Sequence, residues 1–207
     1  MPTPCVDPIF LPAANLARSH HRAPPPQAIG LCNFHTPALR EAYHSLRRLG
    51  VPIATNQVRY SIFNIERELD GTLETCLELG IAPVAHTPLA GGLASTFYAH
   101  ALARRSGQRG RVGRFDTRQL LVLSPLFEAM GAVCEEGVQM RTELQVALRF
   151  AMAKGCIPIP GINNAQHAKE AAGALEWELD LAQIEELSAQ AIILHSRRRE
   201  LPWLQKL

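Results

Sequence analysis

From residue 29 onward, short apolar runs alternate with longer segments whose apolar residues recur at helical spacing. The apolar runs predict strands at residues 28–32, 53–58, 81–85 and 156–159. The longer segments predict helices at residues 37–49, 66–79, 117–136, 142–154, 165–174 and 181–196. The predicted strands are almost continuously apolar, which is typical of a parallel sheet that is covered on both faces.

Glycines mark the predicted helix ends. Gly50, Gly80 and Gly155 each lie between a predicted helix and the next apolar run, where a helix C-terminal glycine is expected. Thr36 and Pro37 predict a helix start, with threonine as the N-cap. Repeated helix–glycine–strand units predict an α/β fold with a parallel sheet. Four such units can form an open sheet or half of an eight-stranded barrel, and periodicity alone does not choose between them.

Residues 1–28 differ from the rest of the chain, since they contain seven prolines and no periodic pattern. We interpret them as a disordered extension or a remnant of a shortened chain, with a targeting peptide as the alternative. The predicted organisation is therefore a Pro-rich extension at 1–28, one folded region at 29–196 and a basic tail at 197–207. Within that tail, Arg197, Arg198 and Arg199 are expected to be solvated.

Composition narrows the function classes. Hydrophobic residues make up 47% of the 207 residues and charged residues 19%, which is enough apolar material for a packed core. A net charge of +2 argues against a nucleic-acid partner, and no apolar run is long enough for a membrane helix. The five cysteines are far apart and form no C-x-x-C pair, which argues against a disulfide framework or a zinc site. We expect single buried thiols in a reducing compartment, and no metal.

Polar or small residues follow each predicted strand. These are Asn33 after the first strand, Asn56 and Gln57 in the second, His86 and Thr87 after the third, and Gly161 and Asn163 after the fourth. Ligands of parallel α/β folds bind at the carboxyl ends of the strands. One such cluster is weak evidence, because these residues also cap turns. Their repetition at the same end of the sheet predicts a ligand site there.

Two features favour an anionic ligand. Ala90, Gly91 and Gly92 follow the third strand, and glycines there let backbone amides approach a phosphate. Six arginines fall within residues 104–118, separated by glycines, and the alternative interpretation of this segment is a solvated basic loop. The G-x-G-x-x-G and G-x-x-x-x-G-K-[ST] motifs are both absent from the sequence.

Four segments together resemble the aldo-keto reductase family. Residues 29–34 (IGLCNF) resemble its I-G-V-S-N-F strand, and residues 56–61 (NQVRYS) its N-Q-V-x-Y-S strand. Residues 85–92 (AHTPLAGG) resemble A-Y-S-P-L-A-G-G, and residues 158–161 (PIPG) resemble the start of the final strand and helix. The segments keep the family's order and spacing over residues 29–196. The arginine-rich loop and residues 157–161 (IPIPG) are similar to those of the plastid-type branch of plants and algae.

The resemblance implies a (β/α)8 barrel that uses NADPH to reduce aldehydes or ketones, with this chain supplying the C-terminal half, strands 5–8. It implies that Asn33 and Gln57 hold the nicotinamide carboxamide while His86 stacks on the ring. The remaining implied cofactor contacts are Thr87, Leu89 and Gly91 at the pyrophosphate, and Gly161, Gln166 and Glu170 at the adenosine end. Two departures weaken cofactor binding: Cys32 replaces a serine, and Ala171 stands where asparagine is common.

The family's catalytic aspartate, tyrosine, lysine and histidine come from its first four strands, and only Pro-rich sequence precedes Ile29 here. The resemblance therefore assigns no catalytic residue. Three hypotheses stay open: a shortened or half-assembled NADPH-dependent oxidoreductase, a non-catalytic NADPH-binding module, and a truncated product without function. The expected partner is a small carbonyl compound, and exposed sheet edges predict a homodimer. A cytoplasmic or plastid location is expected.

Overall fold

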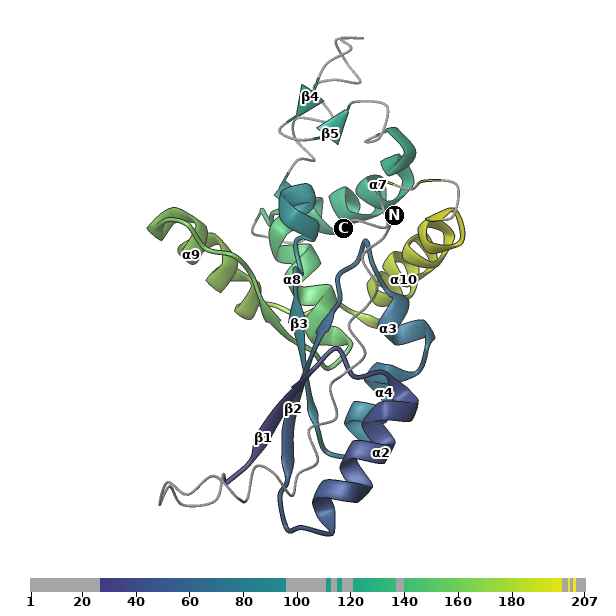
Figure 1. The fold of residues 1–207 in the computed structure, drawn as a ribbon. Coiled ribbons are helices and arrows are strands. Elements are labelled where there is room, and N and C mark those ends of the chain that lie inside the picture. The colour runs from purple at the N-terminus through teal and green to yellow at the C-terminus, as the bar shows by residue number, and fades with distance from the viewer. Residues whose placement is uncertain are drawn as a thin grey trace.

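A four-stranded parallel sheet forms the centre of the protein, whose computed structural model describes residues 27–95, 111–112, 115–116, 121–136, 140–198, 201 and 203. Its strands are β1 (Ile29–Cys32), β2 (Ile53–Arg59), β3 (Ala82–His86) and β6 (Ile157–Ile159), side by side in that order (Figure 1). Each strand of this sheet pairs with the strand of the same sheet that follows it along the chain, so every crossover steps in the same direction. The predicted parallel α/β class is confirmed.

Helices connect and flank these strands. They are α2 (Thr36–Arg47), α3 (Glu66–Leu69), α4 (Thr72–Glu78), α7 (Ser124–Glu135), α8 (Glu143–Ala153), α9 (Ala165–Ala172) and α10 (Leu181–Ser196). Two 3₁₀ turns, η1 (Ala90–Ser95) and η2 (Gly173–Leu175), and a short antiparallel pair, β4 (Arg111–Val112) with β5 (Phe115–Asp116), complete the described elements. The other residues of the arginine-rich segment and residues 1–26 lie outside the described ranges, and so do the basic loop and the Pro-rich extension that the sequence predicts there.

The ends of the helices confirm some of the signals read from the sequence and contradict others. Gly50, Gly80 and Gly155 all adopt positive φ, at 70°, 68° and 78°, as predicted for glycines that end helices. The single helix predicted over residues 66–79 is wrong, because Gly71 at φ 77° separates α3 from α4. The N-cap of α2 is His35, so Thr36 is the first helical residue and not the cap that the sequence predicts.

Only one face of the sheet is deeply covered, which corrects the expectation of cover on both faces. On the helix side, Asn56, Val58, Pro83 and Ala85 are buried. On the opposite face every residue of the four strands is half-buried or exposed, and Ile157 retains 53% of its accessible surface. The strands therefore alternate between a packed face and an open face.

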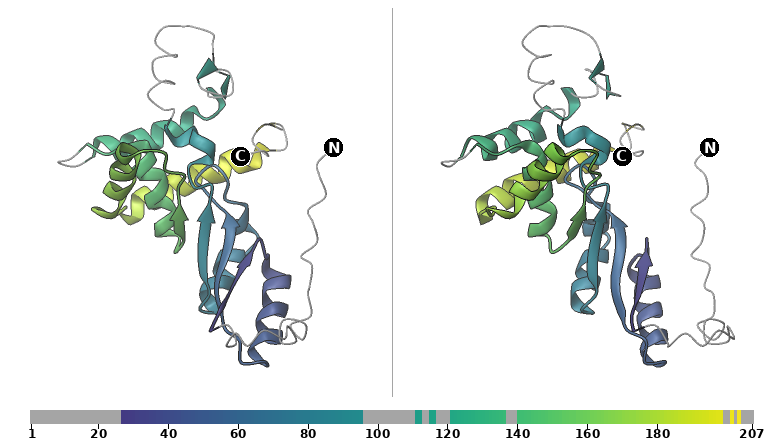
Figure 2. Two further views of the ribbon diagram at one scale, coloured as in Figure 1. Left: turned by 60° about the vertical axis from the view of Figure 1, so that its left-hand side comes forward. Right: turned by 90° about the vertical axis from the view of Figure 1, so that its left-hand side faces the viewer.

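Three hydrophobic clusters hold the described residues together, the smallest of them formed by Leu144, Leu148 and Ala174. Figure 2 shows the helices that contribute to them in two groups along the sheet. The main core joins the ends of β2 and β3 to α7, α8 and α10, with Tyr60, Phe127 and Phe150 as its largest fully buried side chains. The small core lies between α2, α4 and the beginning of the sheet. Its buried members are Leu39, Ala42, Ile53, Cys76 and Ile81.

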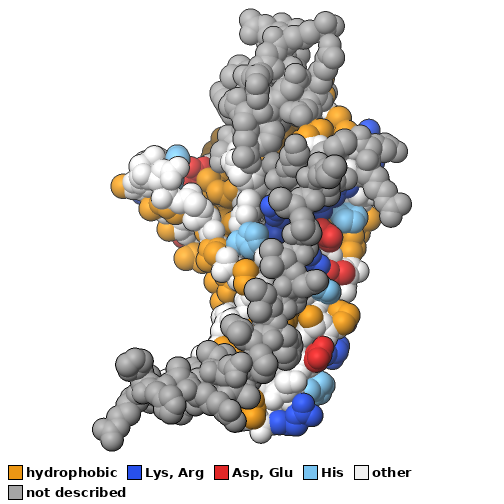
Figure 3. All heavy atoms as spheres, in the orientation of Figure 1, with side chains coloured by type: hydrophobic (Ala, Val, Ile, Leu, Met, Phe, Trp, Pro, Cys, Tyr) orange, Lys and Arg blue, Asp and Glu red, His pale blue; other side chains and the backbone are white. Residues whose placement is uncertain are grey.

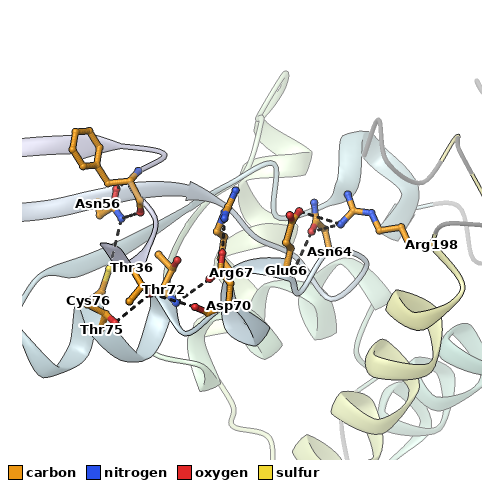
Figure 4. A network of polar contacts seen from close by, with 11 residues as sticks. Thr36, Asn56, Asn64, Glu66, Arg67, Asp70, Thr72, Thr75, Cys76 and Arg198 are labelled. Atoms are coloured by element: carbon orange, nitrogen blue, oxygen red, sulfur yellow. Dashed lines mark hydrogen bonds and ion pairs between the residues drawn. The ribbon is translucent and has the colours of Figure 1, made fainter. Parts of the chain in front are cut away.

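The residues after α10 partly rejoin the core, which corrects the expectation that Arg198 is solvated. Arg198 Nη1 donates to Asn64 Oδ1 at 2.8 Å and lies 3.5 Å from Glu66 Oε2, and its side chain is 13% exposed (Figure 4). Leu201 and Trp203 pack against the main core. Across the described ranges, none of the helices combines the length and apolar character that a membrane span requires.

Candidate functional site

Parallel register aligns the open-face residues into rows at the carboxyl ends of the strands. One row contains Cys32, Gln57, Val84 and Ile157. The next row, closer to the strand ends, contains Arg59, His86 and Ile159. Two predicted site residues, Gln57 and His86, therefore lie on the same face in adjacent rows. Arg59 was not singled out from the sequence, although its alternation with Gln57 places it on that face.

The turn after β1 is held by a buried amide. Asn56 Nδ2 donates to the Phe34 carbonyl at 2.7 Å, and Asn56 Oδ1 accepts from the Phe34 amide at 3.3 Å (Figure 4). The Asn33 amide donates to the Gln57 carbonyl at 2.8 Å, and Asn33 adopts φ 59°. Asn56 is thus a structural residue on the packed face, whereas Asn33 is exposed at the strand end. Because Asn33 lies beside Gln57, one ligand can contact both side chains.

His86 and Thr87 end β3 in a strained arrangement. Their side chains are joined by a hydrogen bond of 2.9 Å between His86 Nδ1 and Thr87 Oγ1, and Thr87 has φ 58°. Partial burial, and secondarily the charge of Arg59, lower the pKa of His86. The imidazole is therefore neutral at neutral pH, which favours a stacking or hydrogen-bonding role over a cationic one.

The following turn has an unusual backbone that two of its own hydrogen bonds fix. The Ala90 amide donates to the Thr87 carbonyl at 2.9 Å, and the Gly92 amide donates to the Leu89 carbonyl at 3.0 Å. Ala90, Gly91 and Gly92 all have positive φ. Backbone strain that the surrounding structure maintains is concentrated at functional sites. A Cβ at Gly92 would meet nothing within 4 Å, so the space beside this turn is open.

A cavity of about 600 Å³ lies between this turn and the segment after β6. Its lining includes five of the predicted contacts, which are Thr87, Leu89, Gly91, Gly161 and Glu170. Asn163, which the sequence marks as a strand-end polar residue, also lines it. The volume falls within the range of about 300–1,000 Å³ that small-molecule sites occupy.

Gln166 is not among the residues that line this cavity, and His167 is. Both residues lie in the first turn of α9, whose N-cap Asn164 accepts a hydrogen bond from the His167 amide at 2.9 Å. Helical spacing cannot separate them, because Gln166 is four residues and His167 three residues before Glu170. The structure brings His167, and not Gln166, to the same wall as Glu170.

No group of three or more His, Cys, Asp or Glu side chains that could hold a metal ion occurs among the described residues. Of the four described cysteines, Cys76, Cys134 and Cys156 are buried and free, as expected, whereas Cys32 is exposed.

Comparison with known proteins places the chain among relatives that are about twice as long. Pyridoxal reductase (chloroplastic) of Arabidopsis thaliana is 30% identical over 154 residues, which cover 74% of this chain and 40% of that protein. Probable pyridoxal reductase 2 of Schizosaccharomyces pombe is 29% identical, over 66% of this chain and 43% of that protein. The chain therefore spans less than half the length of these relatives.

The chain also spans less than half of the similar solved structures. A thermostable aldo-keto reductase crystallised with the inhibitor epalrestat is 25% identical, with a TM-score of 0.54 over 79% of this chain and 48% of that one. The aldose reductase of Schistosoma japonicum, at 18% identity and a TM-score of 0.51 over 79% of this chain and 41% of that one, supports the fold. The model of the aldo/keto reductase family matches residues 27–192. The chain therefore belongs to the aldo/keto reductase family of oxidoreductases.

Proposed function

We propose that the chain binds NADPH across the carboxyl ends of its strands and serves a carbonyl reductase as its cofactor-binding part. The observation that carries this proposal is the cavity of about 600 Å³ between the glycine turn and the segment after β6. It lies at the same strand ends as Asn33 and Gln57, so one elongated ligand can contact both. A dinucleotide has the required length and polar character.

In this proposal the open face holds the nicotinamide end. The side-chain amides of Asn33 and Gln57 can donate to and accept from the nicotinamide carboxamide. His86 stacks on the ring, and its neutral form avoids charge repulsion with a cationic oxidised nicotinamide. The bound cofactor would supply the hydride. The contribution of these three residues is to orient the ring at the strand ends.

The cavity fits the other end of the cofactor. Thr87, Leu89 and Gly91 line the proposed pyrophosphate position, and the absence of side chains at the glycine turn allows a close approach. Gly161 and Glu170 are assigned to the adenosine end, where a carboxylate can accept hydrogen bonds from ribose hydroxyls. We replace Gln166 with His167 in this set. The 2′-phosphate is assigned to the arginine-rich segment from its sequence, because arginine pairs bidentately with phosphate.

Neither of the two described tyrosines is placed to act as a proton donor on the open face. The alkoxide that develops when a carbonyl accepts a hydride needs a positioned acid, whose loss costs about 10² to 10⁴ in rate. Among the described tyrosines, Tyr60 is fully buried and Tyr43 lies on α2, where its hydroxyl accepts from Arg47 at 3.0 Å. Neither lies on the open face. This observation is why we keep a second candidate function, a non-catalytic NADPH-binding module.

Titration calorimetry with NADPH and NADH tests the binding proposal. We expect weak binding of NADPH and weaker binding of NADH. A Cβ at Gly161 would meet nothing within 4 Å, so Gly161→Phe should fill the cavity without disturbing the fold and abolish binding. The matched control is Ala165→Phe, on the exposed start of α9 and outside the cavity lining. Equal loss in both variants, or no binding of either nucleotide, would refute the proposal.

Turnover separates the two candidate functions. Pyridoxal is the substrate to test first, because two relatives are named as pyridoxal reductases. We expect no oxidation of NADPH by the purified chain above the rate without enzyme. Clear oxidation that is abolished in Tyr60→Phe or in His86→Gln would reject the non-catalytic module and assign the acid to that residue.

A plastid location is the remaining part of the proposal, supported by the relative that is named as chloroplastic. Fusion of residues 1–28 to a fluorescent reporter tests whether they act as the alternative targeting peptide, and plastid import would support the plastid location. A diffuse cytoplasmic signal would favour the alternative location.

A further inference from the structure

We propose that the carbonyl compound at this site carries a carboxylate, and that the guanidinium of Arg59 binds it. The inference rests on the proposed function, because it takes the same strand ends as the place where a carbonyl compound meets the cofactor. Three observations carry it: the register of β2 against β3, the charged groups around Arg59, and the partial burial of its side chain.

Arg59 lies at the carboxyl end of β2, on the open face of the sheet. Its register partner on β3 is His86, and Gln57 lies two residues earlier on the same face. Parallel strands rise about 3.3 Å per residue and lie about 4.8 Å apart. Arg59 is therefore directly beside the proposed stacking residue and about 6.6 Å beyond the proposed carboxamide contact. Because β2 is paired on both sides, this placement does not depend on either edge of the sheet.

The row that contains Arg59 also has an apolar member. Ile159 follows His86 in the same row, on β6, and is 45% exposed. If His86 covers one face of the nicotinamide ring, a carbonyl compound lies on the other face, farther from the strands. Arg59 can reach past the edge of that ring, because three methylenes carry its charged end away from the backbone. One cation and one apolar side chain at the same level suit a compact apolar body with an anionic end.

Positive charge is concentrated around Arg59. Partial burial, and then the charge of Arg59, lower the pKa of His86. Burial also lowers the pKa of Arg198, an effect that the charge of Glu66 opposes and that of Arg59 increases. Figure 4 shows Arg198 held by Asn64 and Glu66, and Figure 3 shows basic and acidic side chains close together in the middle of the visible surface. A ligand carboxylate beside Arg59 would reduce the repulsion between its guanidinium and that of Arg198.

The chemistry of arginine favours a carboxylate at this position. A guanidinium has five N–H donors in a planar fork, so Arg59 keeps donors for a ligand in addition to its interaction within the chain. The fork pairs bidentately with a carboxylate, and the partial burial of Arg59 strengthens that attraction by excluding water. We therefore expect a carboxylate ligand to bind at least about tenfold more tightly than an uncharged ligand of the same shape.

Two alcohols of the same shape test this inference. They are para-hydroxymethylbenzoate and para-hydroxymethylbenzamide, which represent the reduced product and, unlike aldehydes, do not condense with lysines. Their dissociation constants are measured by saturation-transfer NMR on the full chain, with and without NADPH. The carboxylate should bind more tightly by about tenfold or more. Arg59→Gln should abolish this preference, and Arg59→Lys should keep part of it, because an ammonium retains the charge but lacks the fork.

The control is Arg40→Gln on α2, whose guanidinium pairs with Glu78 at 2.6 Å, and it should keep the full preference. Equal binding of the two alcohols, or no binding of the carboxylate, would overturn the inference. So would a preference that Arg59→Lys retains in full, which decides the matter even if Arg59→Gln does not fold. Loss of NADPH affinity in folded Arg59→Gln protein would assign Arg59 to the cofactor and also overturn it.

The same measurements separate this inference from the proposed function. A chain that binds NADPH but does not prefer the carboxylate would overturn the role of Arg59 and leave the proposed function intact. A chain that does not bind NADPH, but whose preference for the carboxylate is lost in Arg59→Gln, would refute the proposed function and support the anion site.

Discussion

The hydroxyl of Tyr60 donates a hydrogen bond of 2.6 Å to Glu68 Oε2 inside the molecule. The other carboxylate oxygen accepts from Lys154 Nζ at 2.7 Å, so one side chain of α3 ties the end of β2 to the end of α8. Burial, and then the charge and hydrogen bond of Glu68, raise the pKa of Tyr60 far above its usual range. A tyrosine, a lysine and a carboxylate meet here as a structural link at the edge of the packed core, where Tyr60 is buried and Glu68 and Lys154 are partly buried.

Tyr60→Phe should therefore reduce stability and leave ligand binding unchanged. A hydrogen bond to a charged group contributes about 1.5–3 kcal/mol, so we expect the free energy of unfolding in urea to fall by about that amount. Tyr43→Phe, which removes a hydroxyl from the surface of α2, should change it by less than about 0.5 kcal/mol. Loss of NADPH affinity in folded Tyr60→Phe protein would contradict the structural role.

Asn56 and Gln57 should separate stability from binding, because they are neighbours on opposite faces. Asn56→Ala leaves the Phe34 amide and carbonyl without their side-chain partner, and each buried unsatisfied group costs about 1–3 kcal/mol. Gln57→Ala should leave the urea midpoint nearly unchanged and weaken NADPH binding. Calorimetric titration and urea unfolding of both variants provide the measurements. The reverse pattern would mean that the assignment of the two faces is wrong.

His86 should make stability depend on pH in one direction. Its pKa is lowered in the folded chain, so the unfolded chain binds the proton first as the pH falls below about 6.5. The free energy of unfolding should therefore decrease from pH 7.5 to pH 5.5, and His86→Gln should make that decrease smaller. The control is His44→Gln, which removes an exposed imidazole from α2. An equal pH dependence in both variants would contradict this assignment.

Reactivity should distinguish the exposed thiol of Cys32 from the three buried thiols of the described residues. Burial raises the pKa of Cys134 and of Cys156 to about 12, and it also raises the pKa of Cys76. Because the thiolate is the reactive species, these three should react slowly with Ellman's reagent at pH 8. In a Cys5→Ser background, one fast thiol is expected, and Cys32→Ser should remove it. More than one fast thiol in the native protein would show that the core opens readily.

The sequence predicted best those elements whose ends carry a capping residue. Asp180 caps α10 in a reciprocal capping box with Gln183, and the helix spans Leu181–Ser196 as predicted. α7 begins at Ser124 with Pro125 in its first turn, whereas residues 117–120, where the helix was predicted to start, lie outside the described ranges. Apolar runs located the strands within one residue at each end. They did not show that only one face is covered, since that depends on tertiary contacts.

The candidate site was predictable to the level of strand ends and no further. Topology alone brings Asn33, Gln57 and His86 to one end of a parallel sheet. The cavity contact of His167 depends on how α9 is oriented, which the spacing before Glu170 does not determine. The sequence predicts Arg198 to be part of a solvated tail. Its partners Asn64 and Glu66 are more than 130 residues away, so no local pattern indicates these contacts.

The small core has a consequence for the order in which the chain can fold. All of its buried residues lie between Leu39 and Ile81, and the three strands that it supports end at His86. Contacts between residues close in sequence form early, because little chain entropy is lost in closing short loops. The segment from β1 to β3 can therefore fold on the ribosome before α7 has been synthesised. β6 must wait for the residues that separate it from β3, so the β6 edge of the described sheet is the last to form.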